Sequence, residues 1–120
     1  MDAKLRVVRG PLSGETIRVP VGKLLIGRET DCQLRLDSKS VSLHHCVLLL
    51  DEYTLRIRDL GSTNGTLVNG HRVGKHESVL LHDDTISIDA ASVFSDAALA
   101  IAVSNPSRRA ITARHSASVR

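Results

Sequence analysis

Residues 66–73 read TLVNGHRV, and this stretch decides the fold class. Its centre, Asn69-Gly70, separates two three-residue segments that contain β-branched and other apolar side chains. A two-residue hairpin loop needs positive φ at both central positions, a conformation that Asn and Gly adopt more readily than other residues. The stretch therefore predicts a β-hairpin whose two strands are joined by a tight turn.

Short segments of alternating polar and apolar residues continue on both sides of this hairpin. Such period-two alternation is typical of strands with one buried and one exposed face. It occurs at residues 4–9, 16–19, 33–36, 53–58 and 85–88, and the more continuously apolar residues 23–26 and 45–50 predict buried strands. Turn-forming residues separate these segments, and no stretch within residues 1–90 shows a convincing helical period. Many short strands at even spacing predict an all-β sandwich or barrel.

The last part of the chain allows two interpretations. Residues 92–95 are compatible with one more strand, and residues 97–103 with either a strand or a short helix. Alanine favours the helix, whereas the position in the chain favours pairing with the first strand. We predict one domain over residues 1–103, followed by a Ser- and Arg-rich flexible tail over residues 104–120.

The net charge of +3 comes from the C-terminal part of the chain. Residues 1–89 contain 12 Lys/Arg and 12 Asp/Glu, whereas residues 90–120 contain four Arg against one Asp. A polyanion-binding domain normally carries a basic face on its folded part, and base-stacking modules need aromatic side chains. The chain has one Phe, one Tyr and no Trp. We therefore expect no nucleic-acid partner for the domain, and binding of nucleic acid through the Arg-rich tail stays as a separate hypothesis.

The cysteine content and the length of the apolar runs indicate the cellular compartment in which we expect the protein. The two cysteines, Cys32 and Cys46, are too few for a disulfide-based extracellular scaffold. The longest apolar run, residues 47–50, is far too short to cross a bilayer, and no signal-peptide pattern precedes the first predicted strand. We expect a cytoplasmic protein with two free thiols and no membrane partner.

Three polar segments adjoin the predicted strands. They are residues 27–32 (GRETDC), 40–45 (SVSLHH) and 59–66 (DLGSTNGT), and they contain a guanidinium, several hydroxyls and a side-chain amide. A guanidinium donates two parallel hydrogen bonds to phosphate oxygens, hydroxyls donate to the remaining oxygens, and an amide both donates to and accepts from a peptide backbone. This combination suits a phosphate monoester on a peptide.

The order and spacing of these motifs resemble the forkhead-associated (FHA) domain family over roughly residues 3–95. The matching motifs are Gly27-Arg28, Ser42 with His45 three residues on, GSTNGT at 61–66, and the stretches 68–70 and 81–86. The resemblance implies a mostly antiparallel β-sandwich of about eleven strands, of the SMAD/FHA-like type, with the three loops clustered at one end. It also implies phosphothreonine-dependent binding of a partner protein, such as a kinase substrate, in cis or in trans.

The same resemblance implies roles for individual residues. Arg28 and Ser42 would bind the phosphate, Thr63 would lie close to it, and Asn64 would hydrogen-bond the ligand backbone. The residues that would shape the loops are Gly27, His45, Gly61 and Gly65. Leu43 departs from the family pattern, in which many members carry Arg or another polar residue at this position. Two consequences stay open: a lower affinity for the phosphate, or compensation by neighbours such as Lys39 or His44.

Metal binding and catalysis are alternatives to a binding module. His44 and His45 could ligate zinc, but side chains of adjacent strand residues point to opposite faces. Ser42, His45 and Asp59 could form a hydrolase triad, but the chain has no Gly-x-Ser-x-Gly turn. We therefore expect no enzyme, no metal and no cofactor. A phospho-independent interaction or assembly domain of the same fold stays as the alternative function.

Overall fold

The computed structural model describes residues 3–10, 12–88 and 100–105, and these residues form eleven β-strands and no helix. The strands are β1 (Lys4–Arg9), β2 (Thr16–Arg18), β3 (Gly22–Gly27), β4 (Leu34–Arg35), β5 (Cys46–Leu50), β6 (Leu55–Asp59), β7 (Leu67–Val68), β8 (His71–Arg72), β9 (Ser78–Leu80), β10 (Thr85–Ser87) and β11 (Ala100–Ser104). Within the described part of the chain, no helix has the length and apolar character needed to cross a bilayer.

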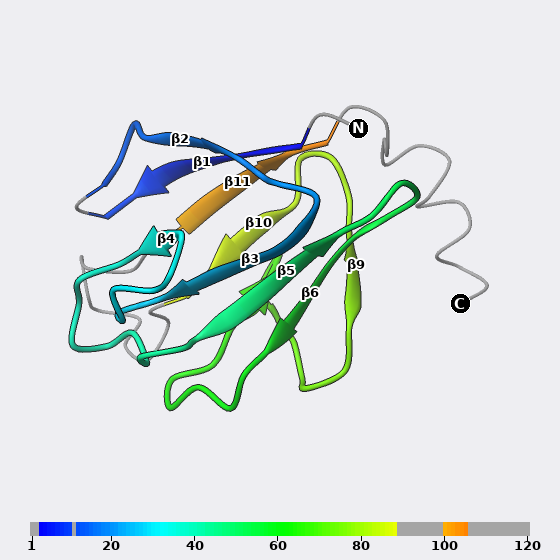
Figure 1. Cartoon of the computed structure of the whole chain (residues 1–120). Helices are drawn as coiled ribbons and strands as arrows, with labels where there is room; N and C mark the ends of the chain where they lie inside the picture. Colours follow the sequence, from blue (N-terminus) through cyan, green and yellow to red (C-terminus); the bar gives the residue numbers. More distant parts are fainter. Residues whose placement is uncertain (1–2, 11, 89–99, 106–120) are drawn as a thin grey trace.

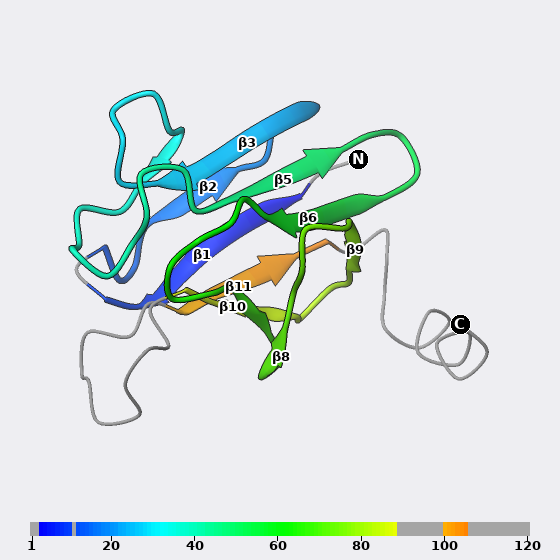
Figure 2. The same ribbon diagram turned by 90° about the horizontal axis from the view of Figure 1, so that it is seen from below.

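The strands form two sheets that pack face to face. One sheet has the order β2-β1-β11-β10-β7-β8, and the other has the order β4-β3-β5-β6-β9. Figures 1 and 2 show β1, β11 and β10 on one side of the molecule and β3, β5 and β6 on the other. Neighbouring strands are antiparallel except β3 and β4, which are parallel. The predicted mostly antiparallel β-sandwich is confirmed.

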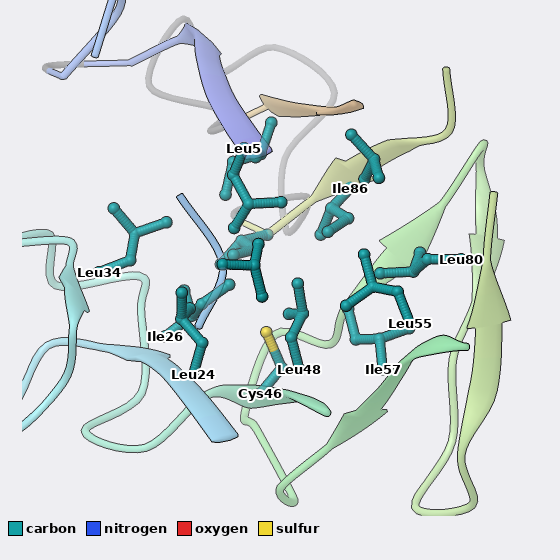
Figure 3. Packing of buried hydrophobic residues seen from close by; sticks show 14 of the residues in the cluster. Leu5, Leu24, Ile26, Leu34, Cys46, Leu48, Leu55, Ile57, Leu80 and Ile86 are labelled. Atoms are coloured by element: carbon teal, nitrogen blue, oxygen red, sulfur yellow. The ribbon is translucent and has the colours of Figure 1, made fainter. Parts of the chain in front are cut away.

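The core between the sheets is aliphatic. Leu24, Leu48 and Ile57 occupy paired positions on three adjacent strands and are fully buried. Figure 3 shows their side chains pointing toward Leu5 and Ile86 of the opposite sheet. Burying one such side chain contributes about 1.5–3 kcal/mol. Many equivalent contacts therefore stabilise the sandwich without any aromatic residue in this cluster.

The hairpin predicted from residues 66–73 is present. Leu67 pairs with Arg72 and Val68 with His71, so only Asn69 and Gly70 remain in the turn. Their φ angles are 51° and 83°, as a two-residue hairpin turn requires.

Two strand predictions need correction. The strand predicted to start at Tyr53 starts at Leu55, because the Asp51 carboxylate accepts hydrogen bonds from the backbone N–H groups of Tyr53 and Thr54 at 2.7 Å. These bonds hold the chain in a turn, where side-chain alternation has no structural meaning. Strand β9 was not predicted, because the consecutive apolar residues 79–81 (VLL) show no alternation.

The C-terminal part of the domain forms a strand where it is described. Ala100–Ser104 is β11, which lies between β1 and β10 and pairs antiparallel with both. The interpretation of residues 97–103 as a strand that pairs with the first strand is therefore confirmed for residues 100–103. The possible strand at 92–95, residues 97–99 and most of the predicted tail lie outside the described residues.

Candidate functional site

Three loops meet at one end of the five-stranded sheet. Ile26, Cys46 and Asp59 are paired neighbours on β3, β5 and β6. The loop that follows β3, the loop that precedes β5 and the loop that follows β6 therefore start side by side (Figure 1). We call residues 27–32, 40–45 and 59–66 together the rim.

Backbone hydrogen bonds join the first and second loops of the rim. The N–H of Arg28 donates to the carbonyl of Ser42 at 3.0 Å, and the N–H of Glu29 donates to the carbonyl of Leu43 at 3.1 Å. These bonds continue the ladder between β3 and β5 beyond the ends of both strands. Residues 28 and 42, which are 14 positions apart in sequence, become neighbours because of this extension.

Gly27 permits this close approach of the two loops. A Cβ atom at position 27 would overlap the carbonyl group of Leu43 and would press against the sulfur of Cys32. The carbonyl belongs to the backbone, so it cannot swing away as a flexible side chain does. Any other residue at position 27 would push the second loop outward.

Arg28 is half-buried and oriented by the second loop. Its Nε donates a hydrogen bond to the carbonyl of Val41 at 3.1 Å. Among the described residues, no carboxylate forms an ion pair with Arg28. The two terminal amino groups of the guanidinium therefore keep their hydrogen-bonding capacity for a ligand.

Side-chain hydrogen bonds join the second and third loops. The hydroxyl oxygen of Ser42 accepts from the N–H of Thr63 at 3.0 Å, and the amide nitrogen of Asn64 donates to the carbonyl of Ser40 at 2.7 Å. Because these bonds connect residues more than 20 positions apart, they fix Thr63 and Asn64 beside Ser42.

His45 links the same two loops from beneath, where it is fully buried. Its Nδ1 accepts from the N–H of Ser42 at 3.1 Å, and its Nε2 donates to the carbonyl of Gly65 at 2.8 Å. These partners require the neutral tautomer with the proton on Nε2. Gly65, with φ of 87°, adopts a conformation that favours glycine, and the guanidinium of Arg72 covers it.

Asp59 shapes the third loop. One carboxylate oxygen accepts from the N–H groups of Gly61 and Ser62, both at 2.8 Å, and the other accepts from the hydroxyls of Ser62 and Thr66. Burial raises the pKa of this carboxyl, but the hydrogen bonds outweigh burial and hold the pKa below its usual value. The role of Asp59 as a turn former could have been recognised from its position just before Gly61-Ser62.

The hydrolase-triad hypothesis does not agree with this geometry. Both ring nitrogens of His45 bond backbone groups, and both oxygens of Asp59 bond groups of its own loop. The hydroxyl of Ser42 accepts from Thr63 and makes no contact with the imidazole of His45 among the described hydrogen bonds. Ser42 and His45 therefore join two loops here, and Asp59 shapes its own loop.

The remaining residues of interest lie around the rim. Gly61 has a φ of 79° in the third loop. Leu43 is 48% exposed, and Lys39 is exposed with no hydrogen bond or ion pair in the described part of the chain. His44 bonds Asp31 at 2.9 Å, so His44 and His45 have separate partners.

Comparison with known proteins agrees with this architecture. The FHA domain family matches residues 24–89. An ABC transporter ATP-binding/permease protein of Mycobacterium tuberculosis is 38% identical over 99 residues, which are 80% of this chain and 11% of that protein. An oxoglutarate dehydrogenase inhibitor of Corynebacterium jeikeium is 36% identical over 87 residues, which are 72% of this chain and 59% of that protein.

A solved structure is similar to this chain in both fold and sequence. This structure comes from a structural and functional study of phosphothreonine-dependent FHA domain interactions. It is 30% identical to this chain in sequence and superimposes with a TM-score of 0.74. The similarity covers 88% of this chain and 97% of that one. The chain thus spans nearly a whole FHA domain of known structure, but only part of the length of the two relatives above.

Proposed function

This chain belongs to the FHA domain family, and from that premise we propose that its rim binds a phosphothreonine-containing segment of a partner protein. FHA domains are interaction modules that recognise phosphorylated motifs, and one relative is named as an inhibitor of an enzyme. In this proposal the chain binds and positions a partner, in cis or in trans, and catalyses no reaction itself.

One observation carries the proposal: hydrogen bonds between the three loops hold Arg28, Ser42 and Asn64 at one end of the sandwich. None of these three side chains lies in the core, and each retains hydrogen-bonding capacity. A preorganised set of donors binds an anion without a further entropy cost of ordering its loops.

Arg28 and Ser42 are proposed to hold the phosphate. The guanidinium is anchored through Nε, so its terminal amino groups can donate two hydrogen bonds to phosphate oxygens. The hydroxyl of Ser42 already accepts from Thr63, so its own proton is available for a third bond. Thr63, next in the rim, adds an exposed hydroxyl. A phosphate carries about −1.5 to −2 charges at neutral pH, and it would meet an arginine that forms no ion pair with a carboxylate of the described residues.

Asn64 is proposed to bind the backbone beside the phosphothreonine. Its amide nitrogen donates to Ser40, which fixes the orientation of the side chain. The amide oxygen can then accept from a ligand N–H, a contact that does not depend on the ligand sequence.

Leu43 and Lys39 are proposed to act at the periphery of the ligand. Leu43 is 48% exposed and follows Ser42 directly, so it offers apolar surface in place of a further phosphate contact. Lys39 is exposed in the same loop region and contributes a positive charge that attracts the ligand at longer range.

The proposal is tested by titrating one peptide sequence in three forms: with phosphothreonine, with phosphoserine and with unmodified threonine. We expect clear binding of the phosphothreonine form and at least about tenfold weaker binding of the unmodified form, since hydrogen bonds to charged groups contribute about 1.5–3 kcal/mol. Arg28→Ala should weaken binding by a similar factor while the circular dichroism spectrum stays unchanged. Arg58→Ala, on strand β6, is the matched control. Equal affinity for all three peptides contradicts the proposal.

The exposed Leu43 supports a second candidate function, a phospho-independent interaction or assembly domain. In that case the partner would contact apolar surface, and a complex isolated from cells would survive phosphatase treatment. Loss of the complex on phosphatase treatment would leave the phosphothreonine proposal as the explanation.

A further inference from the structure

A second cluster of reactive side chains lies within the rim, and it contains none of the residues proposed to hold the phosphate. It consists of Asp31, Cys32 and His44, whose ligand atoms all lie within 4.8 Å of one another. Asp31 and Cys32 belong to the loop after β3, and His44 belongs to the loop before β5. The sequence does not predict this cluster, because nothing in the spacing connects Cys32 with a residue 12 positions later.

One member of this cluster is fixed, and the other two can adjust. Cys32 is only 7% exposed, its N–H donates to the carbonyl of Glu29 at 3.1 Å, and its sulfur lies 3.5 Å from the carbonyl oxygen of Leu43. The side chains of Asp31 and His44 are 59% and 46% exposed and face each other, with the Nε2 of His44 2.9 Å from a carboxylate oxygen. Solvent-exposed side chains of this kind can shift without disturbing the core.

From this geometry we propose that Asp31, Cys32 and His44 form a binding site for a zinc ion. Thiolate, imidazole and carboxylate are the three ligand types that zinc uses in proteins. A thiolate and an imidazole also select against Mg²⁺ and Ca²⁺, which prefer all-oxygen sites. The site is separate from the proposed phosphate contacts and does not depend on peptide binding.

The distances suit a tetrahedral ion after a small adjustment. Zinc–ligand bonds of about 2.0–2.3 Å place neighbouring ligand atoms about 3.3–3.7 Å apart. The Nε2 of His44 lies 2.9 Å from a carboxylate oxygen of Asp31, and the sulfur of Cys32 lies 3.9 Å from the same oxygen. To reach the zinc geometry, the first pair must move apart and the second pair must move closer, each by about an ångström or less. Three protein ligands leave a fourth position for water.

Zinc binding releases one proton from the site. The thiol of Cys32 loses its proton to solvent when the sulfur bonds the metal, and the weak contact from this thiol to the carbonyl of Leu43 is lost. Neutral His44 binds through Nε2, so its remaining proton resides on Nδ1. Asp31 binds as the carboxylate. One zinc ion therefore releases one proton, and it links the loop that carries Arg28 to the loop that carries Ser42.

The test titrates the metal-free chain with Co²⁺ and then with Zn²⁺, without peptide. We expect one ion per chain and a near-ultraviolet absorption band from a cobalt–thiolate bond, which one equivalent of zinc removes. Cys32→Ala should abolish the band, and His44→Ala should weaken binding at least tenfold. His44 is exposed, so its replacement leaves the core unchanged.

His71→Ala is the matched control, since His71 is an exposed histidine in the β7–β8 hairpin outside the cluster. Retention of the cobalt band and of the affinity in this variant supports the site. A titration without the thiolate band, an unchanged affinity in His44→Ala, or an equal loss in His71→Ala would overturn the proposal. A phosphopeptide titration of the metal-free chain separates this result from the proposed function.

Discussion

The aliphatic interior of the sandwich and the polar rim are stabilised in different ways. In the interior, many similar contacts between leucine, isoleucine and valine add up, and no single pair determines the arrangement. In the rim, strand register brings the loop ends together, and a few directional bonds, such as those of Ser42 and His45, fix how the loops lie against one another. The difference teaches that burial of apolar surface stabilises the interior, whereas specific hydrogen bonds set the arrangement of the rim, where we propose that the ligand binds.

Leu48→Ala should give the largest loss of stability. Leu48 is 0% exposed and lies on β5, at the centre of the five-stranded sheet. Removing its side chain costs about 3 kcal/mol through lost burial and a residual cavity, measured as the free energy of unfolding in urea. Val21→Ala, at a position that is 80% exposed, should change this energy by less than about 0.5 kcal/mol. A loss as small in Leu48→Ala as in Val21→Ala would break the comparison.

Gly27→Ala should combine a moderate loss of stability with a loss of binding. The added methyl group meets the backbone carbonyl of Leu43, and overpacking of this kind costs about 1–3 kcal/mol. Because the second loop must move, phosphopeptide affinity should fall as well. The control is Gly74→Ala, where an added Cβ meets no atom within 4 Å; calorimetric binding and urea unfolding of both variants provide the measurement. Normal peptide affinity in Gly27→Ala would show that the loop contact is not needed for the site.

Asp59 should produce the smallest effect, and one that depends on pH. Hydrogen bonds hold its folded-state pKa below the unfolded value despite burial, so its contribution is present in full above an unfolded pKa of about 3.9. The contribution is lost as the pH falls through the lower, folded pKa. Asp59→Asn should cost about 1–2 kcal/mol at pH 7 and should flatten the decline of stability between about pH 5 and pH 2.

Urea unfolding of the natural chain and of Asp59→Asn across this pH range provides the measurement. Asp51 also has a lowered pKa, through bonds from Thr54 and Tyr53; it is present in both proteins, so its effect cancels in the difference. Identical pH profiles for the two proteins would show that the third loop does not rely on the carboxylate of Asp59.

Local signals in the sequence predicted most of the fold. The turn at Asn69-Gly70 was predictable because a two-residue hairpin turn needs positive φ only at its two central residues, which are adjacent in the sequence. The buried strands β3 and β5 were predictable because their apolar runs are long enough to show a pattern. Strand β9 and the turn at Tyr53 were not, because the first shows no alternation and the second is held by a side chain two residues earlier.

The site shows a similar division. The residues proposed to bind the phosphopeptide, Arg28, Ser42 and Asn64, were apparent from the motifs and from the family resemblance. The hydrogen bonds from Thr63 to Ser42 and from Asn64 to Ser40 were not predictable, since they join loops that are far apart in sequence. The cluster of Asp31, Cys32 and His44 was missed for the same reason.

By itself, the sequence determined most of the strands, the hairpin turn and the set of polar groups available to the loops, because alternation and turn preferences act between residues close together in the chain. Only the tertiary structure decided which of those groups meet. The register of Ile26, Cys46 and Asp59 places three loop ends side by side, and pairing between distant strands depends on packing of the whole sandwich rather than on any local pattern.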